Sequence, residues 1–173
     1  PFDSADATSA GHLYDDLSVL GMDAGADSAI LGPLVGRNLP EPLSIGDGTG
    51  LERGDDVFLV GFPGESNTDE LEATIASGIV SRLREVKEFD QSYIQTDASI
   101  GGGQSGGPLF DAAANLVGIS GLSFAEEFAL ALTGRDVKTA MQRIVKGDGD
   151  EYLSVPAAVP SGSGPTSGTL KIY

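Results

Sequence analysis

The chain has 173 residues and a mass of 17.7 kDa, which suits one domain with a packed core. It carries 10 Lys and Arg against 26 Asp and Glu, a net charge of −16 and an isoelectric point near 4.1, which disfavours binding to nucleic acid or to an anionic membrane surface. There is no apolar run long enough for a membrane span, and the absence of Cys excludes disulfides, thiolate metal sites and a cysteine nucleophile.

Short strands are predicted along most of the chain. Gly and Pro together make up about a fifth of the residues, and only one stretch has helical periodicity, which favours a turn-rich, mostly β protein. Residues 21–42 are predicted to be a loop with a short apolar segment at 30–35, and 71–83 could form one long bent strand or two short ones. The predicted strands are 16–20, 43–45, 57–62, 71–83, 92–96, 116–119 and 128–132.

One helix is predicted near the end of the chain. Thr133 can cap it, Val137, Met141 and Ile144 recur at helical spacing, and Gly147 ends it. Strands that recur every 10 to 20 residues or so, joined by Gly-rich turns, predict an antiparallel barrel or sandwich before the helix.

The most informative stretch is the loop at residues 101–107, which holds five glycines, Gln104 and Ser105. Glycine adopts positive φ freely, so this composition indicates either a flexible Gly/Ser linker or a loop held in unusual geometry. In the second case the Ser105 hydroxyl is exposed while backbone N–H groups converge on one point, as acyl transfer requires. A predicted strand at residues 92–96 before the loop, and Pro108, Leu109 and Phe110 directly after it, favour an embedded loop.

Residues 96–109, TDASIGGGQSGGPL, resemble the nucleophile segment of trypsin-like (chymotrypsin-fold) serine proteases, closest to the Deg/HtrA branch. Further stretches agree with that branch in order and spacing: residues 16–20 with the segment of the triad Asp, residues 54–63 and 74–81 with "G-D-x-V-x-x-x-G-x-P … T-x-x-S-G-I-V-S", and residues 116–119 and 128–130 with its closing section. The resemblance covers roughly residues 13–145.

The resemblance implies an all-β fold, the chymotrypsin-like antiparallel β-barrel. The chain would hold mainly the second barrel plus the end of the first, with one C-terminal helix. Residues 1–146 would form the C-terminal portion of the protease domain. Residues 147–173, which include a stretch rich in Pro, Gly, Ser and Thr, would form a flexible linker and the start of a possible further domain.

The resemblance also implies the site residues. Ser105 would be the nucleophile, and Asp16 the carboxylate that orients the catalytic histidine, with its neighbour Asp15 as the rival. The N–H groups of Gly103 and Ser105 would form the oxyanion hole. Residues Ser99 and Ile100 would line the pocket for the side chain that precedes the scissile bond.

An edge strand formed by Gly121, Leu122 and Ser123 would pair with extended substrate. A shallow, apolar pocket predicts cleavage after small or medium apolar residues. Glu126 and Glu127, near the pocket wall, offer the alternative of a basic preference or of side chains that simply face solvent.

The third member of the catalytic triad, the histidine, has no match at the position that the resemblance implies. The only histidine, His12, stands four residues before Asp16, whereas the family's histidine lies tens of residues before the triad Asp. His12 is therefore interpreted as a surface or loop residue, and an N-terminal protease segment that carries the histidine is the expected partner. Without that segment the chain is expected to be inactive.

The predicted function is that of a serine-type endopeptidase acting on protein or peptide substrates, without cofactor or metal. The alternatives are a pseudoprotease or peptide-binding module that does not cleave, and a purely structural β domain, which leaves the loop at 103–107 unexplained. By resemblance to the Deg/HtrA branch, an extracytoplasmic or secreted location is favoured.

Overall fold

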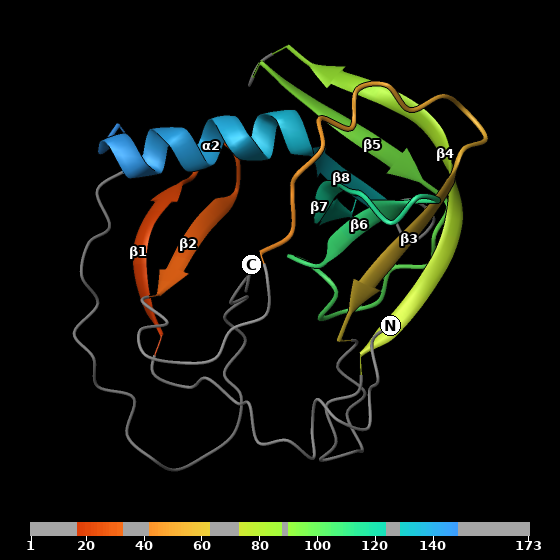
Figure 1. The fold of residues 1–173 in the computed structure, drawn as a ribbon, viewed down its shortest axis with the longest axis horizontal. Coiled ribbons are helices and arrows are strands. Elements are labelled where there is room, and N and C mark those ends of the chain that lie inside the picture. Colours follow the sequence, from red (N-terminus) through yellow and green to blue (C-terminus); the bar gives the residue numbers. More distant parts are fainter. Residues whose placement is uncertain (1–16, 33–41, 63–72, 88–89, 124–128, 149–173) are drawn as a thin grey trace.

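The computed structural model describes residues 17–32, 42–62, 73–87, 90–123 and 129–148. These form a β-hairpin, a closed barrel of six strands and one helix (Figure 1). The hairpin joins β1 (Ser18–Asp23) to β2 (Ser28–Gly32). The barrel follows in the chain, and α2 (Gly134–Lys146) comes after its last strand.

All pairs of neighbouring strands in the barrel are antiparallel, in the order β3-β4-β5-β8-β7-β6, and the pairing of β3 with β6 closes it. This confirms the predicted antiparallel barrel. The strands are β3 (Asp56–Gly61), β4 (Thr74–Val86), β5 (Gln91–Thr96), β6 (Pro108–Asp111), β7 (Leu116–Ser123) and β8 (Ala129–Thr133).

The barrel interior is filled by aliphatic side chains that alternate along the strands. On β3, Val57 and Leu59 are fully buried and point inward, because successive side chains of a strand face opposite sides. They pack against Ile94 of β5 and Leu109 of β6. A second cluster, with Leu130, Leu132, Val137 and Ala140 among its members, joins the barrel to the helix.

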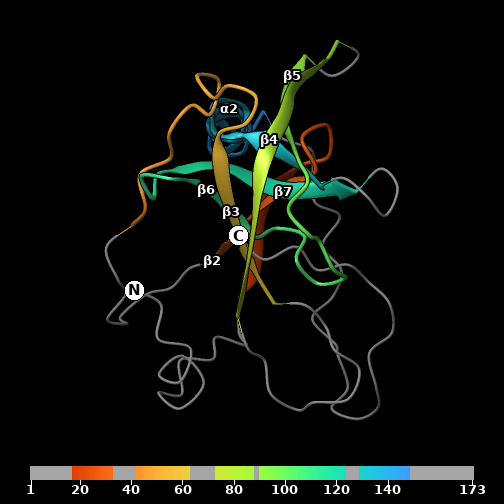
Figure 2. The ribbon, with the colours of Figure 1, turned by 90° about the vertical axis from the view of Figure 1, so that its right-hand side faces the viewer.

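The helix α2 packs against both the hairpin and the barrel. Figure 1 shows it above β1 and β2, with its first turn beside the barrel, and the quarter turn of Figure 2 shows it end-on. Arg143 near its end donates to Asp23 of β1 at 2.6 Å, and Gly21 of β1 packs against Ile144. Gly147 ends the helix in the left-handed conformation that favours glycine, as predicted.

Three elements differ from the sequence-based expectation. Residues 21–42 were expected to be a loop, but residues 21–23 and 28–32 belong to the hairpin, which turns through Asp27 at positive φ. The predicted strand 43–45 is reduced to one bridge between Ile45 and Leu116. Strand β6 was not expected. Of the two alternatives predicted for residues 71–83, the single long strand is correct, because β4 is one strand of 13 residues.

Two apolar side chains of α2 are exposed, Met141, which belongs to the predicted apolar face, and Val145. In the part of the chain that the structure describes, no helix is both long and apolar enough to cross a membrane.

Candidate active site

Ser105 lies in the loop that leads from β5 to β6, and its side chain is half-buried. Two glycines of this loop have backbone angles that other residues rarely adopt, with φ of 97° at Gly103 and 88° at Gly106. These two angles require glycine on either side of the Gln104–Ser105 pair. The loop therefore has a defined backbone conformation, which is not what a flexible linker would have.

Hydrogen bonds fasten the end of the loop to β7. The N–H of Gly106 donates to the carbonyl oxygen of Ser120 at 2.6 Å, and the N–H of Ser120 donates to the carbonyl oxygen of Gly107 at 2.9 Å. The Ser120 hydroxyl donates to the carbonyl oxygen of Gln104 at 2.5 Å, and the Gly107 N–H donates to the same oxygen at 3.1 Å. The backbone on both sides of Ser105 is thus held by β7.

Packing also fixes this end of the loop. A Cβ atom added at Gly107 would lie well inside 3.0 Å of the Val60 carbonyl oxygen, closer than Cβ atoms come to other atoms. Gly107 therefore allows the loop to lie directly against β3.

Gln104, which sequence reasoning did not single out, is buried with 4% of its surface exposed. Its Oε1 accepts the N–H of Gly101 at 2.5 Å, and its Nε2 donates to Oγ1 of Thr74, the first residue of β4, at 3.2 Å. Oγ1 of Thr74 donates in turn to the carbonyl oxygen of Gly61 at 3.4 Å. No sequence signal marks this residue, because glutamine is usually exposed.

The two expected oxyanion donors lie in this loop. The N–H groups of Gly103 and Ser105 make no hydrogen bond with any other residue that the structure describes. Of the two expected pocket residues, Ser99 is exposed, and Ile100 is half-buried and packs against the barrel core.

The predicted substrate strand lies at the end of β7. Leu122 and Ser123 pair with Leu130 and Ala129 of β8, whereas the strand pairing of β7 with β6 ends at Ile119. Gly121, Leu122 and Ser123 thus extend β7 past the end of β6. The expectations for His12, Asp15, Asp16, Glu126 and Glu127 fall on residues outside those that the structure describes.

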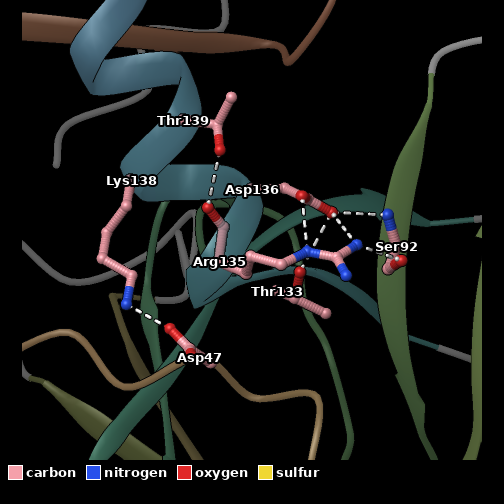
Figure 3. A network of polar contacts seen from close by, with 7 residues as sticks. All are labelled: Asp47, Ser92, Thr133, Arg135, Asp136, Lys138 and Thr139. Carbon is pink, nitrogen blue, oxygen red and sulfur yellow. Dashed lines mark hydrogen bonds and ion pairs between the residues drawn. The ribbon is translucent and has the colours of Figure 1, made fainter.

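A separate polar network holds the first turn of α2 (Figure 3). The Asp136 carboxylate accepts the N–H of Ser92 at 2.6 Å, the hydroxyl of Thr133 at 3.1 Å and Nε of Arg135 at 3.1 Å. The hydrogen bond to Asp136 raises the pKa of Arg135. This network ties the helix to β5 and serves the fold.

Lys138 pairs with Asp47 beside this network, and the hydrogen bond from Lys138 lowers the pKa of the Asp47 carboxyl (Figure 3). Among the described residues there is no group of three or more His, Cys, Asp or Glu side chains that could hold a metal ion.

In the part of the chain that the structure describes, a closed six-stranded antiparallel barrel carries a glycine-rich serine loop and is followed by one helix, which is the arrangement predicted for a chymotrypsin-like fold. The family model of the trypsin-like peptidase domain matches residues 3–119, and the chain belongs to this family. The fold, mostly β with a closed six-stranded antiparallel barrel, is the trypsin-like fold that the sequence predicted.

The relatives place the chain in the Deg/HtrA branch. It is 30% identical over 139 residues to the serine protease Do-like HtrB of Bacillus subtilis, covering 74% of this chain and 30% of that protein. It is 36% identical over 111 residues to the chloroplastic Protease Do-like 1 of Arabidopsis thaliana, covering 61% of this chain and 24% of that protein.

A solved structure of the HtrA-type protease AlgW with a decapeptide superimposes with a TM-score of 0.66 at 28% identity, covering 76% of this chain and 40% of that chain. The chain spans less than a third of the length of the two curated relatives and less than half of the AlgW chain.

Proposed function

We propose that this chain is the nucleophile-bearing part of a serine endopeptidase that hydrolyses peptide bonds through an acyl-enzyme on Ser105. The observation that carries the proposal is the loop at residues 101–107. It presents Ser105 between two left-handed glycines and is fastened to β7 by backbone hydrogen bonds. Membership of the trypsin-like peptidase family supports the same chemistry.

In this mechanism the Ser105 hydroxyl attacks the scissile carbonyl carbon and passes its proton to an imidazole base. The N–H groups of Gly103 and Ser105 stabilise the negative charge that develops on the carbonyl oxygen. The protonated base then gives its proton to the leaving amine, and water later cleaves the ester on Ser105. Asp16 orients the imidazole and stabilises its charged form.

The base is proposed to lie outside residues 1–173. His12 stands only four residues before Asp16, which does not fit the family's order and spacing. Loss of an essential triad member lowers turnover by about 10⁶. Residues 1–173 alone are therefore expected to give no robust turnover. Robust turnover by the isolated chain that is abolished by His12→Ala would contradict this and make His12 the base.

The substrates are proposed to be extended peptides that pair with residues Gly121, Leu122 and Ser123, by strand addition where β7 continues past β6. The solved HtrA-type relatives hold a tripeptide and a decapeptide, which supports a peptide substrate. With Ser99 and Ile100 in the pocket, cleavage after Val, Ala or Leu is expected, with broad selectivity. A dominant preference for Arg or Lys in a peptide library would overturn this and point to Glu127.

The test uses the full-length protein, a peptide substrate and a fluorophosphonate probe that reacts with activated serines. Ser105→Ala should abolish labelling and lower turnover by about 10⁶. Ser77→Ala, on an exposed serine of β4, is the matched control and should leave both unchanged. A wild-type protein that binds peptides but neither cleaves them nor reacts with the probe would be a peptide-binding module instead.

A further inference from the structure

The proposed oxyanion hole has an unusual requirement. Its first donor, Gly103, is the last of three consecutive glycines, and glycine has the greatest backbone freedom of any residue. Oxyanion stabilisation depends on donors that are already in position before the reaction. Something must therefore hold Gly103 in place.

Packing does not hold this end of the loop. Gly101, Gly102 and Gly103 are all exposed, and a Cβ atom added at Gly102 would meet no atom within 4 Å. The contrast with the other end is clear, because Gly107 lies directly against the backbone of β3. Hydrogen bonds are the remaining means of fixing the three glycines.

Gln104 supplies two of these bonds to the same residue. Its own N–H donates to the carbonyl oxygen of Gly101 at 3.3 Å, and its side-chain Oε1 accepts the N–H of Gly101 at 2.5 Å. Together they clamp both polar backbone groups of Gly101. Gly102 and Gly103 lie between the two clamped residues, so their peptide planes have few alternatives.

The clamp is itself anchored in the barrel. Nε2 of Gln104 donates to Oγ1 of Thr74 on β4, and the Gln104 carbonyl oxygen accepts the hydroxyl of Ser120 on β7. Gly61 at the end of β3 leaves room for the side chain, since a Cβ atom there would lie 2.9 Å from Cγ of Gln104. Three strands therefore fix the position of Gln104.

We propose that Gln104 is a positioning residue for catalysis, whose side-chain amide links Gly101 to Thr74 and so holds the N–H of Gly103 in the oxyanion hole. This proposal rests on the proposed endopeptidase function. The amide acts through Gly103, whose N–H binds the scissile carbonyl oxygen most strongly in the transition state, when that oxygen becomes negatively charged. Loss of the clamp should therefore lower kcat and leave KM nearly unchanged.

The experiment compares two glutamine variants in the full-length protein. Gln104→Met keeps the size of the side chain and removes its two side-chain hydrogen bonds, to the N–H of Gly101 and to Oγ1 of Thr74. Gln91→Met makes the same change at a control position, because Gln91 is also buried, donates to the carbonyl oxygen of Gly25 at 2.8 Å and accepts the hydroxyl of Tyr93 at 2.7 Å. Steady-state kinetics on a peptide substrate, the rate of fluorophosphonate labelling and the melting temperature are measured for each variant.

For Gln104→Met we expect kcat to fall about 10- to 100-fold, less than the roughly 10²–10³-fold loss on removing an oxyanion donor altogether. KM should change by less than about threefold, and the labelling rate should fall with kcat. Gln104→Met and Gln91→Met should lower the melting temperature by similar amounts, because each removes two hydrogen bonds of a buried side chain. Gln91→Met should leave kcat within about twofold of the wild-type value. Equal kcat values for the two variants would overturn the proposal.

A second pair of variants covers the case in which Gln104→Met does not fold. Thr74 is exposed, so its replacement perturbs the core little. Thr74→Val removes the partner of Nε2 and should lower kcat several-fold, whereas Thr74→Ser keeps the hydroxyl and should retain wild-type kcat. Equal kcat in both overturns the anchoring of the clamp. A wild-type protein that neither cleaves peptides nor reacts with the probe overturns the proposed function instead.

Discussion

Replacement of Gly107 by Ala tests whether the serine loop must lie directly against β3. The added Cβ would fall well inside 3.0 Å of the Val60 carbonyl oxygen and 3.0 Å from the Gln104 carbonyl oxygen. Both are backbone atoms, so a side-chain rotation cannot relieve the contact, and the loop or the strand must move by roughly 1 Å. Overpacking of this kind costs about 1–3 kcal/mol.

The same movement strains two hydrogen bonds of Gly107, one from its N–H to Gln104 and one from Ser120 to its carbonyl oxygen. Each contributes about 1 kcal/mol. We therefore expect a loss of about 3 kcal/mol in the free energy of unfolding, which for a domain of this size lowers the melting temperature by about 6–12 °C. Reaction of Ser105 with a fluorophosphonate should slow in the same variant.

Gly102→Ala is the matched control, because it adds the same methyl group to the same loop where nothing lies within 4 Å. It should change the melting temperature by less than about 2 °C. The melting temperatures of the two variants are measured by thermal unfolding under the same conditions and compared. If Gly107→Ala melts within 2 °C or so of Gly102→Ala, the described packing of the loop on β3 is refuted.

Three further outcomes are expected. Asp136→Ala leaves the buried N–H of Ser92 without its acceptor and should lower the free energy of unfolding by about 1–3 kcal/mol in urea titrations, whereas Lys138→Ala, which removes an exposed pair, should change it little. Burial acts to raise the pKa of Asp111, but hydrogen bonds from Asn115 and Ala113 outweigh it and lower the pKa. The stability that Asp111 contributes should therefore be complete well above its unfolded value of 3.8 and be lost as the pH falls through that value and on through the folded pKa. Comparison with Asp111→Asn across acid pH checks this, and a difference that persists unchanged to the lowest pH contradicts it. With a net charge of −16, the melting temperature should rise from low to moderate salt, and a flat or falling value would contradict the role of self-repulsion.

Most barrel strands could be predicted because their signal is local. The run 57–62 is apolar and short, and the runs near Ser92 and Leu116 are short and contain the β-branched, aromatic and aliphatic residues that favour strands. Strand β6 was missed because it has only four residues and begins with Pro108, so its pairing with β3 and β7 decides its structure. The first strand of the hairpin was predicted at 16–20, but its second strand was missed because the packing partner of the hairpin, α2, lies far along the chain.

The residues of the candidate site also differ in how far the sequence could point to them. The glycine-rich pattern pointed to Ser105 as a candidate, the family resemblance pointed to Gly103, and their roles stay predictions; what the structure adds is the positive φ of Gly103 and of Gly106. Gln104 could not be singled out, because its burial depends on Gly61 and on Thr74, 30 residues earlier in the chain. A polar residue that looks exposed in sequence becomes a buried bridge only when the barrel brings three strands around it.

The position of α2 has a consequence for how the protein is made. Asp23 and Arg143 are partners separated by 120 residues, and the hairpin begins two residues after Asp16. At a synthesis rate of about 5–20 residues per second, the emerging hairpin waits roughly 6–24 seconds for the helix on which it docks. The proposed triad carboxylate thus adjoins an element that has no docking partner until nearly the whole barrel has been synthesised. During biosynthesis the order of the chain therefore delays docking of the hairpin until α2 has been made.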